Sequence, residues 1–149
     1  MKRLFQNLLL ITAVFSITFL ISCNDDEGTI TEEPTDFDYH AHIMSPNADT
    51  KNVGDNIHIH VNFESHTGEV VHHVQVTIYS KSDNTVIYTG LSDAHVHAMN
   101  GSYEFHDDFV LSDAVGVTGH SDWVLEAKVW GHEAGMAEEI ETVEFHVHP

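Results

Sequence analysis

The chain has 149 residues, and its 24 Asp and Glu residues against 5 Lys and Arg residues give a formal net charge of −19. A surface this acidic repels nucleic acid and anionic lipid headgroups and attracts cations, which argues against a nucleic-acid partner. The only cysteine, Cys23, excludes an intramolecular disulfide and a cysteine-based zinc site, so the 14 histidines are the main candidate metal ligands.

The N-terminus has the features of an export signal. Two basic residues precede a largely apolar run over residues 4–21. The tetrapeptide Leu20-Ile21-Ser22-Cys23 then resembles the lipobox of bacterial lipoproteins, in which the signal is cut before an acylated cysteine. The resemblance implies a signal peptide over residues 1–22 and an anchor in the cell envelope of a Gram-negative bacterium, at the periplasmic face of the outer membrane or the cell surface. The alternative is an uncleaved transmembrane anchor, because the apolar run is nearly long enough to span a bilayer.

After this signal the chain divides into a tether and one domain. Residues 23–38 are acidic and polar with little to bury, and they predict a disordered tether. Residues 39–149 suffice for one domain with one core, and they contain short alternating runs separated by turn signals. The predicted strands cover residues 39–44, 56–64, 70–80, 85–89, 94–98, 102–111, 122–130 and 140–148. This pattern predicts an all-β fold, an antiparallel β-sandwich of the immunoglobulin-like or fibronectin-III-like kind.

The dipeptide Asn100-Gly101 predicts a tight hairpin between the strands at 94–98 and 102–111. A type I′ turn needs a positive φ at both central residues, and Asn and Gly tolerate that conformation best. The resulting register would place four metal-ligating side chains on one face, with opposed Cβ atoms about 4.5–5.5 Å apart. The first-choice metal site therefore consists of His95, His97, Glu104 and His106.

His-x-His pairs occur on four of the predicted strands and fall on their solvent-facing side. On a strand this spacing points both rings the same way, as a metal site in a β-protein needs. If the first, second, sixth and fifth predicted strands lie side by side, one outer face carries the hairpin residues together with His40, His42, His58 and His60. The other sheet would carry His73, Glu144, His146 and His148.

The loop end of the sandwich is an alternative metal site. One predicted loop holds His66, the third strand begins with two histidines, and another histidine follows the seventh strand. Met99 and Met136 fall in loops toward the same end, and their thioethers would suit Cu(I). The candidate ligands of this loop-end site are His66, His72, His73, His132 and Glu133.

The segment Phe145-His146-Val147-His148 is similar to the copper-ligand strand of copper-zinc superoxide dismutases. The resemblance would make the two histidines copper ligands, but this chain lacks the disulfide cysteines of that family. As a whole, the chain resembles small His-rich bacterial lipoproteins with one immunoglobulin-like domain of uncharacterised function. That resemblance rests on the lipobox, the acidic tether and the His-x-His and Trp-Gly-His elements.

The sequence therefore predicts a membrane-anchored, non-enzymatic lipoprotein that captures, buffers or hands over Zn²⁺ or Cu²⁺. Neutral imidazoles suit both ions. Its expected partners are the lipid bilayer, through acylated Cys23, the metal ion, and a metal transporter or receptor. A pH-sensitive interaction domain for a protein or glycan partner is the alternative, and a small metalloenzyme with an open coordination position is the third hypothesis.

Overall fold

The computed structural model describes residues 38–149 except for residues 92–93 and 133–137, and for His97 it describes the backbone alone. The predicted signal peptide over residues 1–22, Cys23 and nearly all of the tether over residues 23–38 lie outside the described residues and stay predictions. Glu133 and Met136 of the loop-end site lie outside them too. In the described part of the chain, no helix is long and apolar enough to cross a membrane.

The described residues form nine strands and one short 3₁₀ helix, η1 (Asp113–Val115). All eight predicted strands are present within a residue or two of their expected ends, and only a two-residue strand was not predicted. The strands are β1 (Tyr39–Ser45), β2 (Lys51–Asn52), β3 (Asn56–Ser65), β4 (Val71–Ser80), β5 (Val86–Gly90), β6 (His95–Ala98), β7 (Ser102–Val110), β8 (Ser121–Trp130) and β9 (Glu139–His148).

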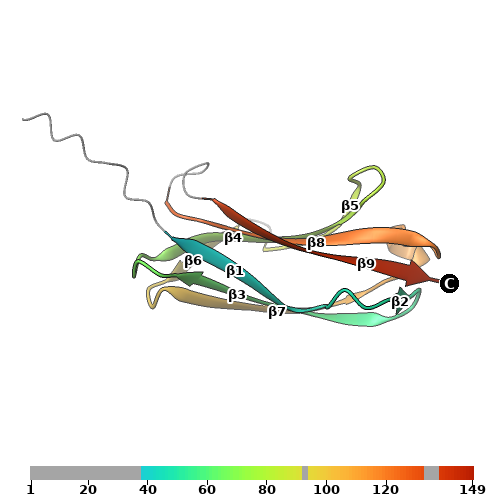
Figure 1. Cartoon of the computed structure of the whole chain (residues 1–149), viewed down its shortest axis with the longest axis horizontal. Coiled ribbons are helices and arrows are strands. Elements are labelled where there is room, and N and C mark those ends of the chain that lie inside the picture. The colour runs from blue at the N-terminus through green and yellow to red at the C-terminus, as the bar shows by residue number, and fades with distance from the viewer. Residues whose placement is uncertain (1–37, 92–93, 133–137) are drawn as a thin grey trace, which may run out of the picture. The chain divides into compact units, whose positions relative to one another are not determined.

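Two sheets pack face to face (Figure 1). The smaller sheet has the order β1-β3-β7, and the larger has the order β2-β9-β8-β4-β5, with β6 also paired to β4. All pairings are antiparallel except β2 with β9. The arrangement confirms the predicted all-β sandwich.

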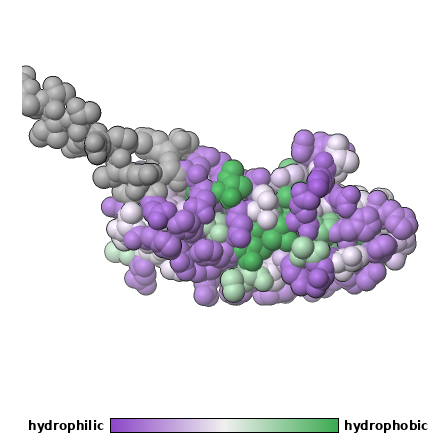
Figure 2. Space-filling model, viewed as in Figure 1, coloured by the Kyte–Doolittle hydropathy of each residue, from purple (hydrophilic) through white to green (hydrophobic). Residues whose placement is uncertain are grey.

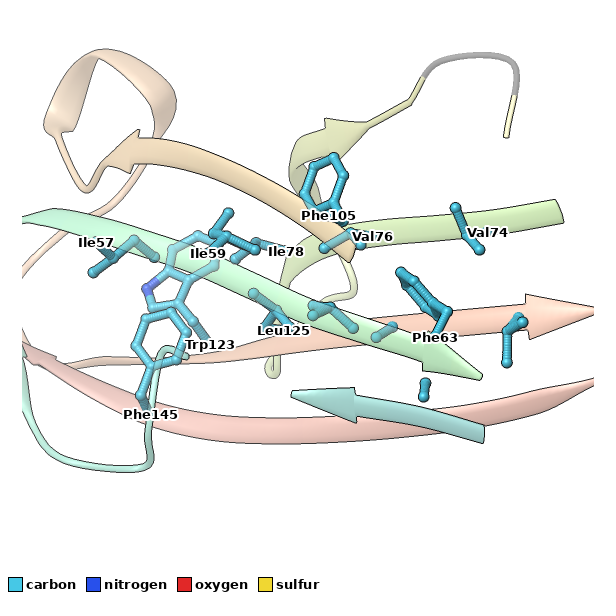
Figure 3. Close-up of a cluster of buried hydrophobic side chains, with 14 of the residues drawn as sticks. Ile57, Ile59, Phe63, Val74, Val76, Ile78, Phe105, Trp123, Leu125 and Phe145 are labelled. Carbon is cyan, nitrogen blue, oxygen red and sulfur yellow. The ribbon is translucent and has the colours of Figure 1, made fainter. Parts of the chain in front are cut away.

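Period-two alternation places the core between the sheets. On β3, Ile57, Ile59, Val61 and Phe63 are buried, while the residues between them are half-buried or exposed. Figure 3 shows the side chains of Ile57, Ile59 and Phe63 facing those of β4, β8 and β9. Hydrophilic residues cover most of the face seen in Figure 2, with a smaller hydrophobic area near its middle. No histidine with a described side chain is among the buried residues, as the alternation of the strands predicts.

The predicted hairpin between β6 and β7 is wrong. Gly101 N donates to Ala98 O at 3.2 Å, so the turn has Met99 and Asn100 at its centre, and only Gly101 has a positive φ, +70°. A type I′ turn at Asn100-Gly101 would need a positive φ at both residues. The chain leaves this turn toward the other sheet, where Ser65 N donates to Gly101 O at 2.7 Å.

The competition between two pairings explains this outcome. β7 forms a continuous register with β3 from Ser102 opposite Glu64 to Val110 opposite Asn56, whereas β6 has only four residues to offer. The longer ladder satisfies more backbone groups and still buries Phe105 between the sheets. The long-range pairing of β7 with β3 therefore decides the structure, although the local sequence Asn100-Gly101 favours a hairpin.

Candidate metal centre

The four residues of the predicted hairpin site do not come together. His95 lies on β6 in the larger sheet, while Glu104 and His106 lie on β7 in the smaller sheet. His97 is on β6, but its side chain lies outside the described part of the structure. A common site for these four residues required β6 to pair with β7, and β6 pairs with β4 instead. His95 therefore joins one group of histidines, and Glu104 and His106 join another.

The outer face of the smaller sheet collects one half of the predicted set. His60 lies opposite His106, with the ring centroids 4.1 Å apart, and Glu104 joins them within ligand range. His58 Nδ1 lies 3.1 Å from Asp108 Oδ1, and its Nε2 is 3.5 Å from His106 Nδ1. The predicted neighbourhood of the first, second and sixth strands is confirmed, whereas the fifth belongs to the other sheet.

His40 is held by carboxylates at both of its ring nitrogens. Nε2 lies 2.6 Å from Asp38 Oδ1, and Nδ1 lies 2.9 Å from Glu139 Oε2. Partial desolvation lowers the pKa of His40, but the hydrogen bond and charge of Glu139 and the charge of Asp38 outweigh it and raise the pKa. Both nitrogens of a ligating imidazole cannot be engaged in this way, because one must offer a lone pair to the metal. The geometry suits a protonated His40 in an ion pair.

His42 and His66 share the same acidic surroundings. His66 Nε2 lies 3.3 Å from Glu64 Oε2, and His42 Nε2 lies 3.9 Å from the same oxygen. The ring of His66 lies 4.4 Å from that of His40. His66 therefore belongs with this ion-paired group, although the sequence had grouped it with the loop-end ligands.

The structure brings together three of the predicted loop-end ligands, His72, His73 and His132, and His95 joins them. His72 and His73 begin β4, His95 begins β6, and His132 follows β8. His73 lies opposite both His95 and Trp130, and the register between β4 and β6 shifts between Val71 and His73. Both Val71 and Val74 are buried, so strict alternation fails between them. This irregularity lets the rings of two successive residues, His72 and His73, meet.

His72 lies at the centre of this group, which we call the loop-end cluster (His72, His73, His95 and His132). Its ring centroid is 4.5 Å from that of His73, 4.4 Å from that of His95 and 4.6 Å from that of His132. His72 Nε2 lies 3.2 Å from His95 Nε2, and His72 Nδ1 lies 3.1 Å from His73 Nδ1. Ligand nitrogens on a tetrahedral Zn²⁺ ion lie about 3.3 Å apart, given Zn–N bonds of about 2.0–2.1 Å. His72, His73 and His95 each offer one ligand nitrogen, and these three nitrogens lie within 4.8 Å of one another, while His132 joins them by ring proximity.

A backbone carbonyl orients one of these rings. His73 Nδ1 donates to Gly131 O at 2.8 Å, which leaves Nε2 as the nitrogen with the lone pair. The His73 ring also stacks on Trp130 at 5.1 Å with an interplanar angle of 6°. A Cβ at position 131 would lie 2.9 Å from Tyr39 Oη, so glycine permits the close approach of β1 to this loop. The hydrogen bond to Gly131 O and the stacking on Trp130 therefore hold the His73 ring in one orientation before any ion binds.

His146 and His148 lie on β9 at the other end of the larger sheet, where His120 joins them. The His-x-His pattern predicted the first two as candidate ligands but not His120. A signal was available, because Thr118-Gly119-His120-Ser121 is a turn sequence just before the predicted seventh strand. The proximity of this turn to β9 depends on the β8–β9 pairing, which local sequence patterns do not reveal.

The sequence matches no known family and no curated protein. Among solved structures, the solution structure of the CARDB domain of a Pyrococcus furiosus protein is 14% identical, with a TM-score of 0.51 over 75% of this chain and 95% of that domain. A crystal structure of the same domain, in complex with di-metal ions, is 12% identical with a TM-score of 0.49, over 75% and 94%. A Paenibacillus cycloisomaltooligosaccharide glucanotransferase is 11% identical with a TM-score of 0.49, over 74% of this chain and 14% of the enzyme. Identities this low show the fold alone, an immunoglobulin-like β-sandwich.

Proposed function

We propose that this chain is a metal-binding domain that captures a divalent ion, Zn²⁺ or Cu²⁺, at the loop-end cluster. The observation that carries the proposal is the convergence of three further imidazoles on His72, with centroid separations of 4.4–4.6 Å. His72 Nε2 and His95 Nε2 lie 3.2 Å apart and can share only one proton between two neutral rings. A divalent ion bound by both of these nitrogens would replace this contact with two ligand bonds.

The chemistry of the donors favours a borderline divalent ion over other metals. Imidazole nitrogens suit Zn²⁺ and Cu²⁺, whereas Ca²⁺ and Mg²⁺ prefer a cage of oxygens. The chain has no second cysteine with which to build a thiolate site. The formal charge of −19 supports the proposal too, because an acidic protein raises the local concentration of cations.

The proposed location is the bacterial cell envelope, where the lipidated Cys23 would hold the domain to a membrane. The Leu20-Ile21-Ser22-Cys23 motif and the preceding apolar run support this part of the proposal. A tethered domain with half-buried and exposed ligands would bind and release metal at the membrane surface. It would thus buffer metal or hand it to a transporter or receptor.

Elemental analysis and calorimetric titration of the full-length protein, purified in detergent without an affinity tag, test the proposal. We expect the double variant His72→Gln/His95→Gln to lose one tightly bound equivalent of Zn²⁺ or Cu²⁺. Affinity should also fall as the pH drops below about 6, because ligand imidazoles must be neutral.

The matched control is His42→Gln, which removes a half-exposed imidazole from the other sheet. This variant should keep the stoichiometry and affinity of the wild type. If the double variant and the control both lose the same fractional, non-integral amount of metal, binding is a diffuse property of a histidine-rich surface and the proposal fails.

The ion pairs of the smaller sheet favour a second candidate function, a pH-sensitive interaction surface. His40 pairs with Asp38 and with Glu139 of β9, and His58 pairs with Asp108. The pKa of His40 is raised, although its desolvation opposes the shift. Because the pKa of His40 is raised, protonation of this residue would add a positive charge at the edge of this face. Partner binding by metal-free protein with a midpoint that moves in His40→Gln would support this function, and a midpoint unaffected by that substitution would count against it.

A further inference from the structure

A second group of three imidazoles lies at the end of the larger sheet opposite the loop-end cluster. His120 precedes β8, and His146 and His148 lie near the end of β9, which ends at the chain terminus marked in Figure 1. One ligand nitrogen from each residue falls within 4.8 Å of the others. β8 spans ten residues between the two groups, which corresponds to about 30 Å at 3.3 Å per residue. The two groups therefore cannot share an ion.

A carboxylate orients the central ring of this group, which we call the β9 cluster (His120, His146 and His148). Asp122 lies opposite His146 in the β8–β9 register, and its Oδ1 accepts from His146 Nδ1 at 2.7 Å. This contact leaves the lone pair on His146 Nε2. Metal-bound histidines are commonly held by such a carboxylate, which fixes the tautomer and strengthens the ligand.

The backbone of His120 gives an independent indication. Its φ is +63°, in the left-handed region, where a residue with a Cβ costs roughly 1–2 kcal/mol. The neighbouring Gly119 does not take a positive φ, and a Cβ there would lie 2.6 Å from Pro149 Cγ. Glycine therefore occupies the crowded position 119, whereas a histidine occupies position 120, where glycine would adopt the left-handed conformation with less strain. Strain of this kind is concentrated at functional sites.

The β-sheet holds this strained residue in place. His120 N donates to Val147 O at 2.7 Å, between the two β9 histidines. The ring centroid of His120 lies 5.5 Å from that of His148 and 6.2 Å from that of His146, and the rings of His146 and His148 are 4.9 Å apart. The left-handed turn therefore brings the third ring over the end of β9.

We propose that the β9 cluster is a second, open site for a divalent ion, with one coordination position left for an exogenous ligand. No fourth His, Cys, Asp or Glu joins the three imidazoles among the described residues, and His120 and His148 are exposed. Three protein ligands plus a solvent-derived one is the arrangement of zinc sites that exchange their fourth ligand. The ligand classes that suit this position are water, small anions and neutral nitrogen donors. The β9 cluster shares no residue with the loop-end cluster.

The test uses the full-length protein in detergent with the loop-end cluster silenced by His72→Gln/His95→Gln. Cu²⁺ is added after EDTA treatment and followed by electron paramagnetic resonance, with and without added imidazole. We expect one Cu²⁺ per chain, with a spectrum that imidazole changes. Adding Asp122→Asn should weaken binding about 10- to 100-fold, the usual effect of losing an outer-shell partner.

His120→Asn separates a ligand role from a structural one. Asparagine tolerates the left-handed conformation but lacks the imidazole, so metal-free stability should be unchanged while Cu²⁺ binding is lost. The control His42→Asn, added to the same silenced background, should retain binding. Equal Cu²⁺ affinity in His120→Asn and His42→Asn would overturn the proposal, as would a spectrum insensitive to imidazole. The loop-end proposal is tested separately, by the effect of the silencing substitutions on the otherwise wild-type chain.

Discussion

Metal bound at the loop-end cluster should stabilise the fold by a calculable amount. Its ligands come from β4, β6 and the segment after β8, so residues as distant as His72 and His132 must be brought together by folding. The unfolded chain does not present such a constellation, and an ion that binds only the folded state stabilises it by mass action. The apparent stability of the protein should therefore rise with the concentration of free Zn²⁺.

The magnitude follows from the size of the domain. At a free Zn²⁺ concentration of 100 times the dissociation constant, the stabilisation is about 2.7 kcal/mol. A domain of about 110 residues unfolds with an entropy of about 230 cal/mol/K, at roughly 2.1 cal/mol/K per residue. Dividing the first value by the second predicts that this site raises Tm by about 12 °C.

Far-UV circular dichroism of the full-length protein, melted in EDTA and at this Zn²⁺ concentration, measures the shift. The His72→Gln/His95→Gln variant should lose about 12 °C of the metal-dependent increase in Tm, while His42→Gln keeps it all. An equal Zn²⁺-dependent shift in the wild type and the double variant would refute the reasoning, since it would place the stabilising ion elsewhere.

Three further predictions concern the fold and its ion pairs. Phe63 is fully buried, so Phe63→Ala should lower the free energy of unfolding by about 3–5 kcal/mol in urea titration, and a loss below about 1 kcal/mol would contradict the packing. A Cβ on Gly90 would lie 2.5 Å from Phe105 Cζ, so Gly90→Ala should cost about 1–3 kcal/mol, and an unchanged urea midpoint would show that β5 shifts freely. Carboxylate contacts outweigh the effect of desolvation and raise the pKa of His40 in the folded protein. Its contribution to the free energy of unfolding is therefore complete below the pKa of the unfolded chain, about 6.5, and is lost as the pH rises through the pKa of the folded protein. In EDTA, His40→Gln should therefore reduce the urea midpoint more at pH 5.5 than at pH 8.5, and the opposite order would exclude a protonated ion pair.

The sequence determined the class of fold and which side of each strand is buried. Ile57, Ile59, Val61 and Phe63 alternate with polar residues, and a period of two is a local property that any sheet pairing must respect. Their burial, and the outward position of His58 and His60, could therefore be read before any contact was known. The tendency of histidine to fall on the outer faces was predictable for the same reason.

Tertiary structure alone decided which histidines meet. The Asn100-Gly101 dipeptide favours a hairpin between β6 and β7. Because β7 instead pairs along its length with β3, and β6 pairs with β4, His95 and His106 lie in different sheets. A register shift at the start of β4 and a left-handed turn at His120 then completed two clusters that strand alternation does not predict. The face of the sheet to which a side chain points is set by the backbone of its own strand. The assembly of a site depends instead on which of several competing pairings forms between strands far apart in the chain.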